Sequence, residues 1–190
     1  MKADRIMNDS HDMKALSLED ALSALGALYD EVDADIARHA PVCRLSARCC
    51  RFREYGHDLF VSGLEREFWL RAGEPAVAAD DWRPGENCPW QSATGMCHAR
   101  KGRPLGCRVY YCDPAFESVM PDITESAISR IKRITGQAGM AWDYRPAHEH
   151  LKATETVWRI SSADRFAGES AALATGDASF HRDRPHTGEP

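Results

Sequence analysis

The strongest pattern of hydrophobic and polar positions lies near the start of the chain, between residues 18 and 36. Apolar residues recur there at alternating steps of four and three, which places them on one face of an α-helix. Acidic residues occupy several of the positions between them. The pattern therefore predicts an amphipathic helix with an apolar stripe made of Leu18, Leu22, Leu25, Tyr29, Val32 and Ile36.

The residues at both ends of this stretch support the same helix. Ser17 and Asp20 have the spacing of a capping box, in which Asp is a weaker partner than Glu. Pro41 disfavours helical backbone at the residue before it, so we expect the helix to end near His39. The stripe either packs within its own domain or forms a homodimer through the helix 18–38. It spans fewer than three heptads, which favours packing within the domain.

Weaker patterns predict three further helices. Ser62 and Glu65 form a second capping box, followed by an apolar face and a glycine, which predicts a helix over residues 63–72. Apolar residues also share one face in the segments 122–136 and 149–159. These helices together predict a mainly α domain.

Short strands and loops are expected elsewhere. Residues 96–98 and 140–144 are interpreted as short strands, the second because apolar residues alternate with others there. The segment 74–87 is rich in Pro, Gly and Asp, which is typical of a loop. His148 and His150 have i, i+2 spacing, which suits a strand face and not a helical metal pair, so we expect them at the surface.

The length of 190 residues is typical of one domain with tails. Residues 1–16 are expected to form a flexible arm, and residues 17–160 a single cysteine-cluster metal-binding domain. Residues 161–190 are mostly small and polar, which predicts a disordered tail.

Composition and motifs exclude several classes of function. The net charge is -5 and no basic stripe is present, so we expect no nucleic-acid partner. No apolar run approaches the roughly 18–20 residues of a membrane span. The polar N-terminus has no signal-peptide core, which predicts a cytoplasmic protein with reduced thiols. Hydrolase, NTPase and dinucleotide-binding motifs are absent from the sequence.

The cysteines carry the strongest chemical signal. Their odd number leaves one thiol over from any disulfide framework, and clustered thiols in a reducing compartment point to metal. Both Zn²⁺ and iron–sulfur clusters are held by four such ligands, presented from turns. The spacing matches neither a zinc finger nor a bacterial ferredoxin, so it leaves the metal open. The candidate metal ligands are Cys43, Cys49, Cys50, Cys88, Cys97, Cys107 and Cys112.

Residues near these cysteines fit such a centre. Turn-forming residues precede two of the cysteines, namely Gly95 before Cys97 and Pro104 before Cys107. Neighbouring guanidinium groups can offset thiolate charge or donate hydrogen bonds to a cluster sulfur. These arginines are Arg48, Arg51, Arg103 and Arg108.

Three cysteine groups also carry a family resemblance. They read Cys43-x-x-Ser46-x-x-Cys49-Cys50, then Cys88-Pro-Trp with Gly95-x-Cys97, then Arg103-Pro104-x-x-Cys107-Arg108-x-x-x-Cys112. Across residues 41–114 this arrangement resembles the YkgJ-type cysteine-cluster family, which has a CxxCxxCC motif and is described as a zinc- or iron-chelating domain. The same region is similar to that of flagellin lysine N-methylases, which are associated with an iron–sulfur cluster.

The resemblance implies an iron–sulfur cluster, of the 4Fe–4S kind, more than Zn²⁺. It does not carry over methylase activity, because nothing here resembles a separate substrate domain. The family's second cysteine is Ser46 in this chain, a poor ligand for a soft metal. The side chains of Cys49 and Cys50 are expected to diverge, which also suits a larger cluster better than one Zn²⁺.

The sequence therefore predicts a small α+β fold, mainly α, with a few short strands and an irregular, metal-stapled, cysteine-rich core. Arg108 and Tyr110 are the candidate cofactor-binding residues beside the cysteines. The expected function is an iron–sulfur protein with a redox role, or one that modifies a protein or small-molecule substrate. The alternatives are a zinc-binding structural or interaction module without catalysis, and a soft-metal trafficking protein. His98 as a ligand and His57 with Asp58 as an acid/base pair are weaker candidates than surface positions.

Overall fold

The structure is a computed structural model that describes residues 15–44, 46–73, 75–76 and 87–153. Its helices are α1 (Leu18–His39), α2 (Phe52–Tyr55), α3 (Gly63–Leu70), α4 (Leu105–Val109), α5 (Met120–Gln137) and α6 (Ala147–Ala153). The strands are β1 (Phe60–Ser62) and β2 (Tyr144–Pro146), and short 3₁₀ turns lie at Arg48–Cys50, Arg100–Gly102 and Pro114–Phe116. The mainly helical α+β fold is thus confirmed.

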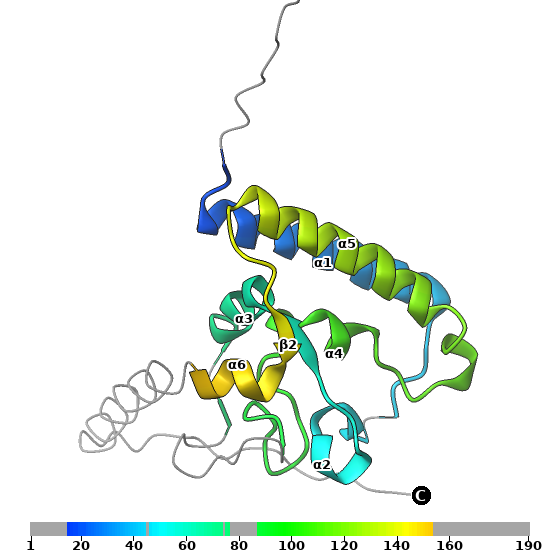
Figure 1. Cartoon of the computed structure of the whole chain (residues 1–190). Helices are drawn as coiled ribbons and strands as arrows, with labels where there is room; N and C mark the ends of the chain where they lie inside the picture. Colours follow the sequence, from blue (N-terminus) through cyan, green and yellow to red (C-terminus); the bar gives the residue numbers. More distant parts are fainter. Residues whose placement is uncertain (1–14, 45, 74, 77–86, 154–190) are drawn as a thin grey trace, which may run out of the picture.

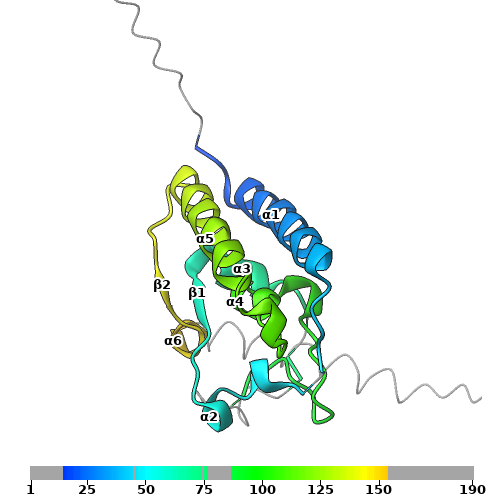
Figure 2. The same ribbon diagram turned by 90° about the vertical axis from the view of Figure 1, so that its right-hand side faces the viewer.

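Helices α1 and α5 lie side by side and run in opposite directions above the rest of the molecule (Figures 1 and 2). The backbone amide of Leu16 donates to the carbonyl of Gln137 at 2.9 Å, which joins the start of one helix to the end of the other. Together with α3 and α4 they bury the larger apolar core, here called the upper core. Its members from the long helices include Leu22, Leu25, Leu28, Tyr29, Val32, Ile36, Ile123, Ala127, Ile131 and Ile134.

The predicted stripe of α1 is therefore buried within the chain. Leu18 is the exception, at 38% exposure. Packing of this helix within its own domain is confirmed, and the structure lends the homodimer through residues 18–38 no support. No described helix is both long enough and apolar enough to span a membrane.

The predicted capping box is complete at α3 and only half formed at α1. The Ser17 side chain accepts a hydrogen bond from the amide of Asp20, and α1 ends where Ala40 adopts a left-handed conformation before Pro41. At α3, Ser62 and Glu65 make both bonds of a capping box. Helix α5 begins two residues before the predicted start, with Pro121 in its first turn, where a missing N–H costs nothing.

Glu65 is more than a cap, because it joins three helices. The side chain is buried, at 2% exposure. Its carboxylate accepts hydrogen bonds from the hydroxyl of Tyr29 on α1 at 2.9 Å and from the amide of Leu105 on α4 at 3.0 Å. The amide and hydroxyl of Ser62 donate to its other oxygen, at 2.8 and 2.9 Å. This network fixes α4, which carries Cys107, relative to α1 and α3.

The two strands form an antiparallel sheet with Val61 opposite Arg145, and β1 leads directly into α3. Helix α6 follows β2 directly and packs back onto β1. His150 is buried within α6, and its Nε2 lies 3.0 Å from the carbonyl oxygen of Val61. The expectation of a surface position was therefore wrong for His150, because α6 begins at Ala147 and turns this side chain inward.

Other predicted elements differ in extent. Residues 96–98 form only an isolated bridge, between Gln91 and Cys97. The strand expected over 140–144 begins only at Tyr144. Most of the predicted 74–87 loop, the end of the 149–159 helix, the arm up to residue 14 and the tail from residue 161 lie outside the described residues.

Candidate metal centre

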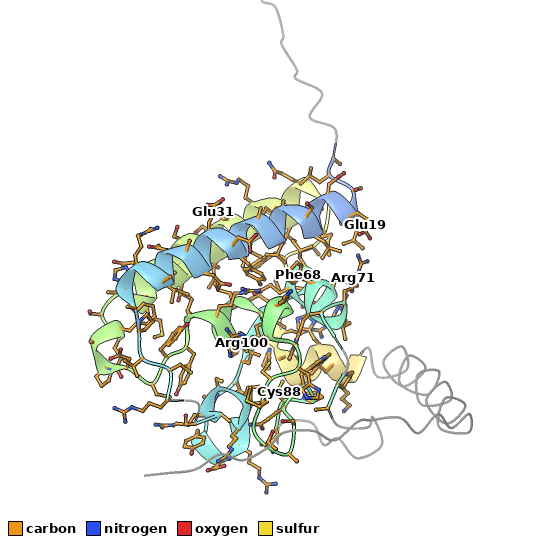
Figure 3. All side chains as sticks on the ribbon, turned by 180° about the vertical axis from the view of Figure 1, so that it is seen from behind. Glu19, Glu31, Phe68, Arg71, Cys88 and Arg100 are labelled. Atoms are coloured by element: carbon orange, nitrogen blue, oxygen red, sulfur yellow. The ribbon has the colours of Figure 1, made fainter. Side chains whose placement is uncertain are left out.

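A second group of buried residues, here called the lower core, lies on the far side of α3 from the long helices. It contains Cys50, Leu59, Val61, Trp69, Cys88, Trp90, Ala99, Cys107, Ala147 and Leu151, with Cys49 and Cys97 packed against it. The indoles of Trp69 and Trp90 lie 4.5 Å apart between ring centroids. Figure 3 shows Cys88 well below the helix pair, whereas Phe68 lies under α1 and Arg71 faces Glu19.

Five cysteines from separate segments meet in this lower core. Cys49 and Cys50 come from the 3₁₀ turn Arg48–Cys50, and their sulfurs are 3.9 Å apart. The amide of Cys88 donates to the carbonyl of Cys50 at 2.9 Å, which ties the second segment to the first. Cys97 follows the turn after Trp90, and α4 presents Cys107. We refer to these residues as the five-thiol group.

The electrostatics show that the thiols of this group influence one another. Contact with Cys49 acts to lower the pKa of Cys50, but contact with Cys88 and burial outweigh it and raise that pKa to about 12. Contact with Cys50 and then burial raise the pKa of Cys49. Burial, reinforced by the neighbouring thiols, raises the pKa of Cys107 well above its usual value. Such thiols stay protonated without a cation, and a bound metal would deprotonate them.

Arg103 is a positively charged residue that acts on several thiols of the group. Its guanidinium acts to lower the pKa of Cys49, Cys97 and Cys107. Its Nε is buried and has no hydrogen-bond partner among the described residues. A buried N–H without an acceptor is costly, so this donor fits a site whose acceptor is a metal-bound sulfur.

Two predicted ligands lie apart from the five. Cys43 is exposed. The sulfur of Cys112 lies 3.5 Å from the hydroxyl oxygen of Ser46. Neither thiol is among the main influences on the pKa values of the group. Within the described residues, no three His, Cys, Asp or Glu side chains are already arranged as a metal site, so the five thiols are gathered without being preformed.

Arg108, a predicted cofactor-binding residue, is engaged elsewhere. Its side chain is buried and makes an ion pair with Asp33 at 2.5 Å. Its Nε donates to the carbonyl of Arg103 at 2.8 Å, and its guanidinium lies 4.1 Å above the ring of Tyr29. These contacts anchor α4 to α1. A role at the cofactor stays a prediction that no contact with the cysteines supports.

Tyr110, the other predicted cofactor-binding residue, lines a cavity of about 220 Å³ that reaches Cys49 and Cys107. His57 and Asp58 lie on the same cavity, and the ring of His57 stacks on Tyr110 at 5.9 Å with the planes 6° apart. The pair expected to lie in a solvated loop thus borders the five-thiol group. His98 is exposed, as predicted.

Comparisons with protein families, with curated proteins and with solved structures find no match to this chain. The resemblance to cysteine-cluster proteins therefore rests on the cysteine motifs alone and stays a prediction.

Proposed function

We propose that the five-thiol group holds an iron–sulfur cluster of the 4Fe–4S kind, in a protein with a redox role or one that modifies a protein or small molecule. The observation that carries the proposal is the convergence of Cys49, Cys50, Cys88, Cys97 and Cys107 in one buried core. A donor set made only of sulfur suits iron–sulfur clusters and Zn²⁺, and disfavours Mg²⁺ and Ca²⁺. Five thiols supply the four ligands of a cluster with one to spare.

The chain's own residues would surround such a centre in distinct ways. A bound cluster supplies one-electron transfer, or an iron site for a substrate. Trp69 and Trp90 exclude water on the buried side, at 2% and 1% exposure. Arg103 supplies a positive charge and a free N–H on another side. The cavity at His57 and Tyr110 is the side from which a small molecule would approach.

A zinc-binding structural module is the second candidate, and one distance favours it. Four sulfurs arranged tetrahedrally at 2.3 Å from Zn²⁺ lie about 3.8 Å from one another. The sulfurs of Cys49 and Cys50 are 3.9 Å apart. The neighbouring side chains therefore converge here, contrary to the expectation that they diverge, and the geometry no longer argues against Zn²⁺ at this pair.

Serine substitutions test which cysteines are ligands. We expect Cys107→Ser to lose at least about half of the bound metal per chain, because it removes a buried ligand. Cys97→Ser, at a less buried position, should do the same with less effect on folding. Cys43→Ser is the matched control and should keep the wild-type metal content, measured by elemental analysis. Wild-type metal in both lower-core variants, or equal loss in Cys43→Ser, would show that the ligand assignment is wrong.

A further inference from the structure

A separate cavity of about 630 Å³ lies beside Cys112, and the proposed metal centre does not use it. Two chain segments contribute to its lining: Arg44, Ser46 and Arg48, here called the polar wall, come from one, and Tyr111, Phe116 and Met120, here called the apolar wall, come from the other. Its volume falls within the range of small-molecule sites, about 300–1,000 Å³. Cys112 also lines the cavity, and its sulfur lies 3.5 Å from the hydroxyl oxygen of Ser46.

Asp113 links the two chain segments that line the cavity. One carboxylate oxygen accepts from the amide of Val42 at 2.9 Å, and the other from the amide of Ala115 at 3.0 Å. These two hydrogen bonds, with a smaller effect of Arg44, hold the pKa of Asp113 below its usual value. The carboxylate is thus committed to backbone amides and holds the segment of Arg44 against that of Cys112.

The polar wall carries two guanidinium groups. Within the described residues, neither Arg44 nor Arg48 has a carboxylate within ion-pair distance; the guanidinium of Arg48 lies 4.5 Å above the ring of Tyr55. Glu117 also lines the cavity and the carboxylate of Asp113 acts on Arg44, but neither carboxylate forms an ion pair with the two guanidinium groups. The other wall is apolar, since Tyr111 packs edge-to-face on Phe116 with ring centroids 5.5 Å apart.

We propose that this cavity binds a small organic carboxylate with a short aromatic or aliphatic body, beside the thiol of Cys112. Arg44 and Arg48 bind the carboxylate, for which a guanidinium is the best-matched donor. The body packs on Tyr111, Phe116 and Met120. A fully hydrated anion such as phosphate would leave this apolar wall uncovered, so the two-sided lining selects a carboxylate attached to an apolar group.

Alkylation by two matched reagents tests the site in the full chain with its metal bound. Iodoacetate carries a carboxylate, whereas iodoacetamide is its neutral counterpart. Peptide mass spectrometry follows the rate of alkylation at each cysteine, and the rate with iodoacetate is divided by the rate with iodoacetamide. We expect this ratio to be at least about three times higher at Cys112 than at the exposed Cys43, because the guanidinium groups attract the anionic reagent. Phenylacetate should slow alkylation of Cys112, and phenylacetamide should not.

Charge variants complete the test. Arg48→Gln should lower the rate ratio at Cys112 to the value at Cys43. We choose Arg48 because Arg44 is next to Cys43, so Arg44→Gln would also change the reactivity of the reference cysteine. Arg133→Gln makes the same charge change at an exposed position of α5 and should leave the ratio unaltered. Equal ratios at Cys112 and Cys43 in the wild type would overturn the proposal. The proposal would also be overturned if Cys112 reacted with neither reagent while Cys43 reacted. It would likewise be overturned if Arg48→Gln and Arg133→Gln changed the rate ratio at Cys112 equally.

Discussion

Single residues with unusual burial hold this molecule together, and Glu65 is the clearest case. Its carboxylate lies among hydrogen-bond donors from α1, from the end of β1 and from α4. A nearby guanidinium, that of Arg108, lies over the Tyr29 ring that donates to Glu65. Burial, followed by the charge of Glu65, raises the pKa of Tyr29 well above its usual value, so the phenol remains a donor.

Removing this carboxylate should therefore be costly. We expect Glu65→Ala to lower the free energy of unfolding by about 3 kcal/mol, because several buried donors lose their acceptor together. Glu67→Ala, on the same helix, removes only a partly exposed ion pair with Arg66 and should cost less than about 1 kcal/mol. Urea denaturation followed by circular dichroism compares the two. A similar small loss in both variants would contradict the role given to Glu65.

His150 gives the fold a dependence on pH. Burial lowers its pKa below the usual value of 6.5, although the carbonyl of Val61 and Asp143 act in the opposite direction. The unfolded chain therefore binds a proton more readily than the folded one, so the stability that His150 provides is present above about pH 6.5 and is lost on acidification. In His150→Gln, the melting temperature should fall less than in the wild type when the pH is lowered by about 2 units, from about pH 7 to about pH 5. His98→Gln, at an exposed position, should leave the wild-type slope; an unchanged slope in His150→Gln would argue against this role.

At the scale of elements, the close approach of α3 to the turn Arg100–Gly102 fixes how the upper and lower cores meet. A side chain on Gly102 would place its Cβ 1.9 Å from the Cβ of Ala72, just beyond α3. Only glycine fits at this crossing without moving the backbone.

Two glycine-to-alanine variants test this crossing with opposite expected signs. Gly102→Ala should destabilise the protein by about 1–3 kcal/mol, because the added methyl group overpacks the contact. Gly136→Ala, within α5, meets no atom within 4 Å and should stabilise by up to about 1 kcal/mol through its better helix propensity. Thermal unfolding distinguishes the two, and a stable Gly102→Ala variant would show that the contact is looser than described.

The elements that could be predicted are those with local signals. The apolar stripe and caps of α1 and the capping box of α3 involve residues close together in sequence, so those helices could be predicted. Helix α4 has only five residues, too few for a period to show, and its place depends on distant donors and acceptors such as Glu65 and Asp33. Helix α6 overlaps the helix predicted over residues 149–159 and begins two residues earlier, at Ala147. The inward turn of His150 could not be predicted, because it depends on the carbonyl of Val61, 89 residues away in sequence.

The metal centre itself stays a prediction, and only the positions of its candidate ligands can be compared with the structure. The cysteine motifs predicted the region, and the structure gathers five of its seven thiols. Cys112 lies outside the lower core and contacts Ser46, a pairing across 66 residues that no local pattern reveals. Arg108 was a reasonable candidate from its place beside Cys107, but Asp33 and Tyr29, far away in sequence, engage its guanidinium.

At the scale of the whole molecule, the two cores differ in the side chains that build them. The upper core, between α1 and α5, is built mainly from aliphatic side chains. The lower core has fewer aliphatic side chains and contains the five thiols, so metal binding would supply much of its folding free energy. Our central claim is that this lower core is completed by a metal–sulfur centre.

The most direct test of that claim is anaerobic purification followed by an ultraviolet–visible spectrum and analysis for iron, zinc and acid-labile sulfide. We predict a broad absorption near about 400 nm, with about four irons and four sulfides per chain. One zinc and no sulfide would contradict the iron–sulfur centre and leave the structural zinc module. A folded, stable protein with neither metal would contradict the central claim itself.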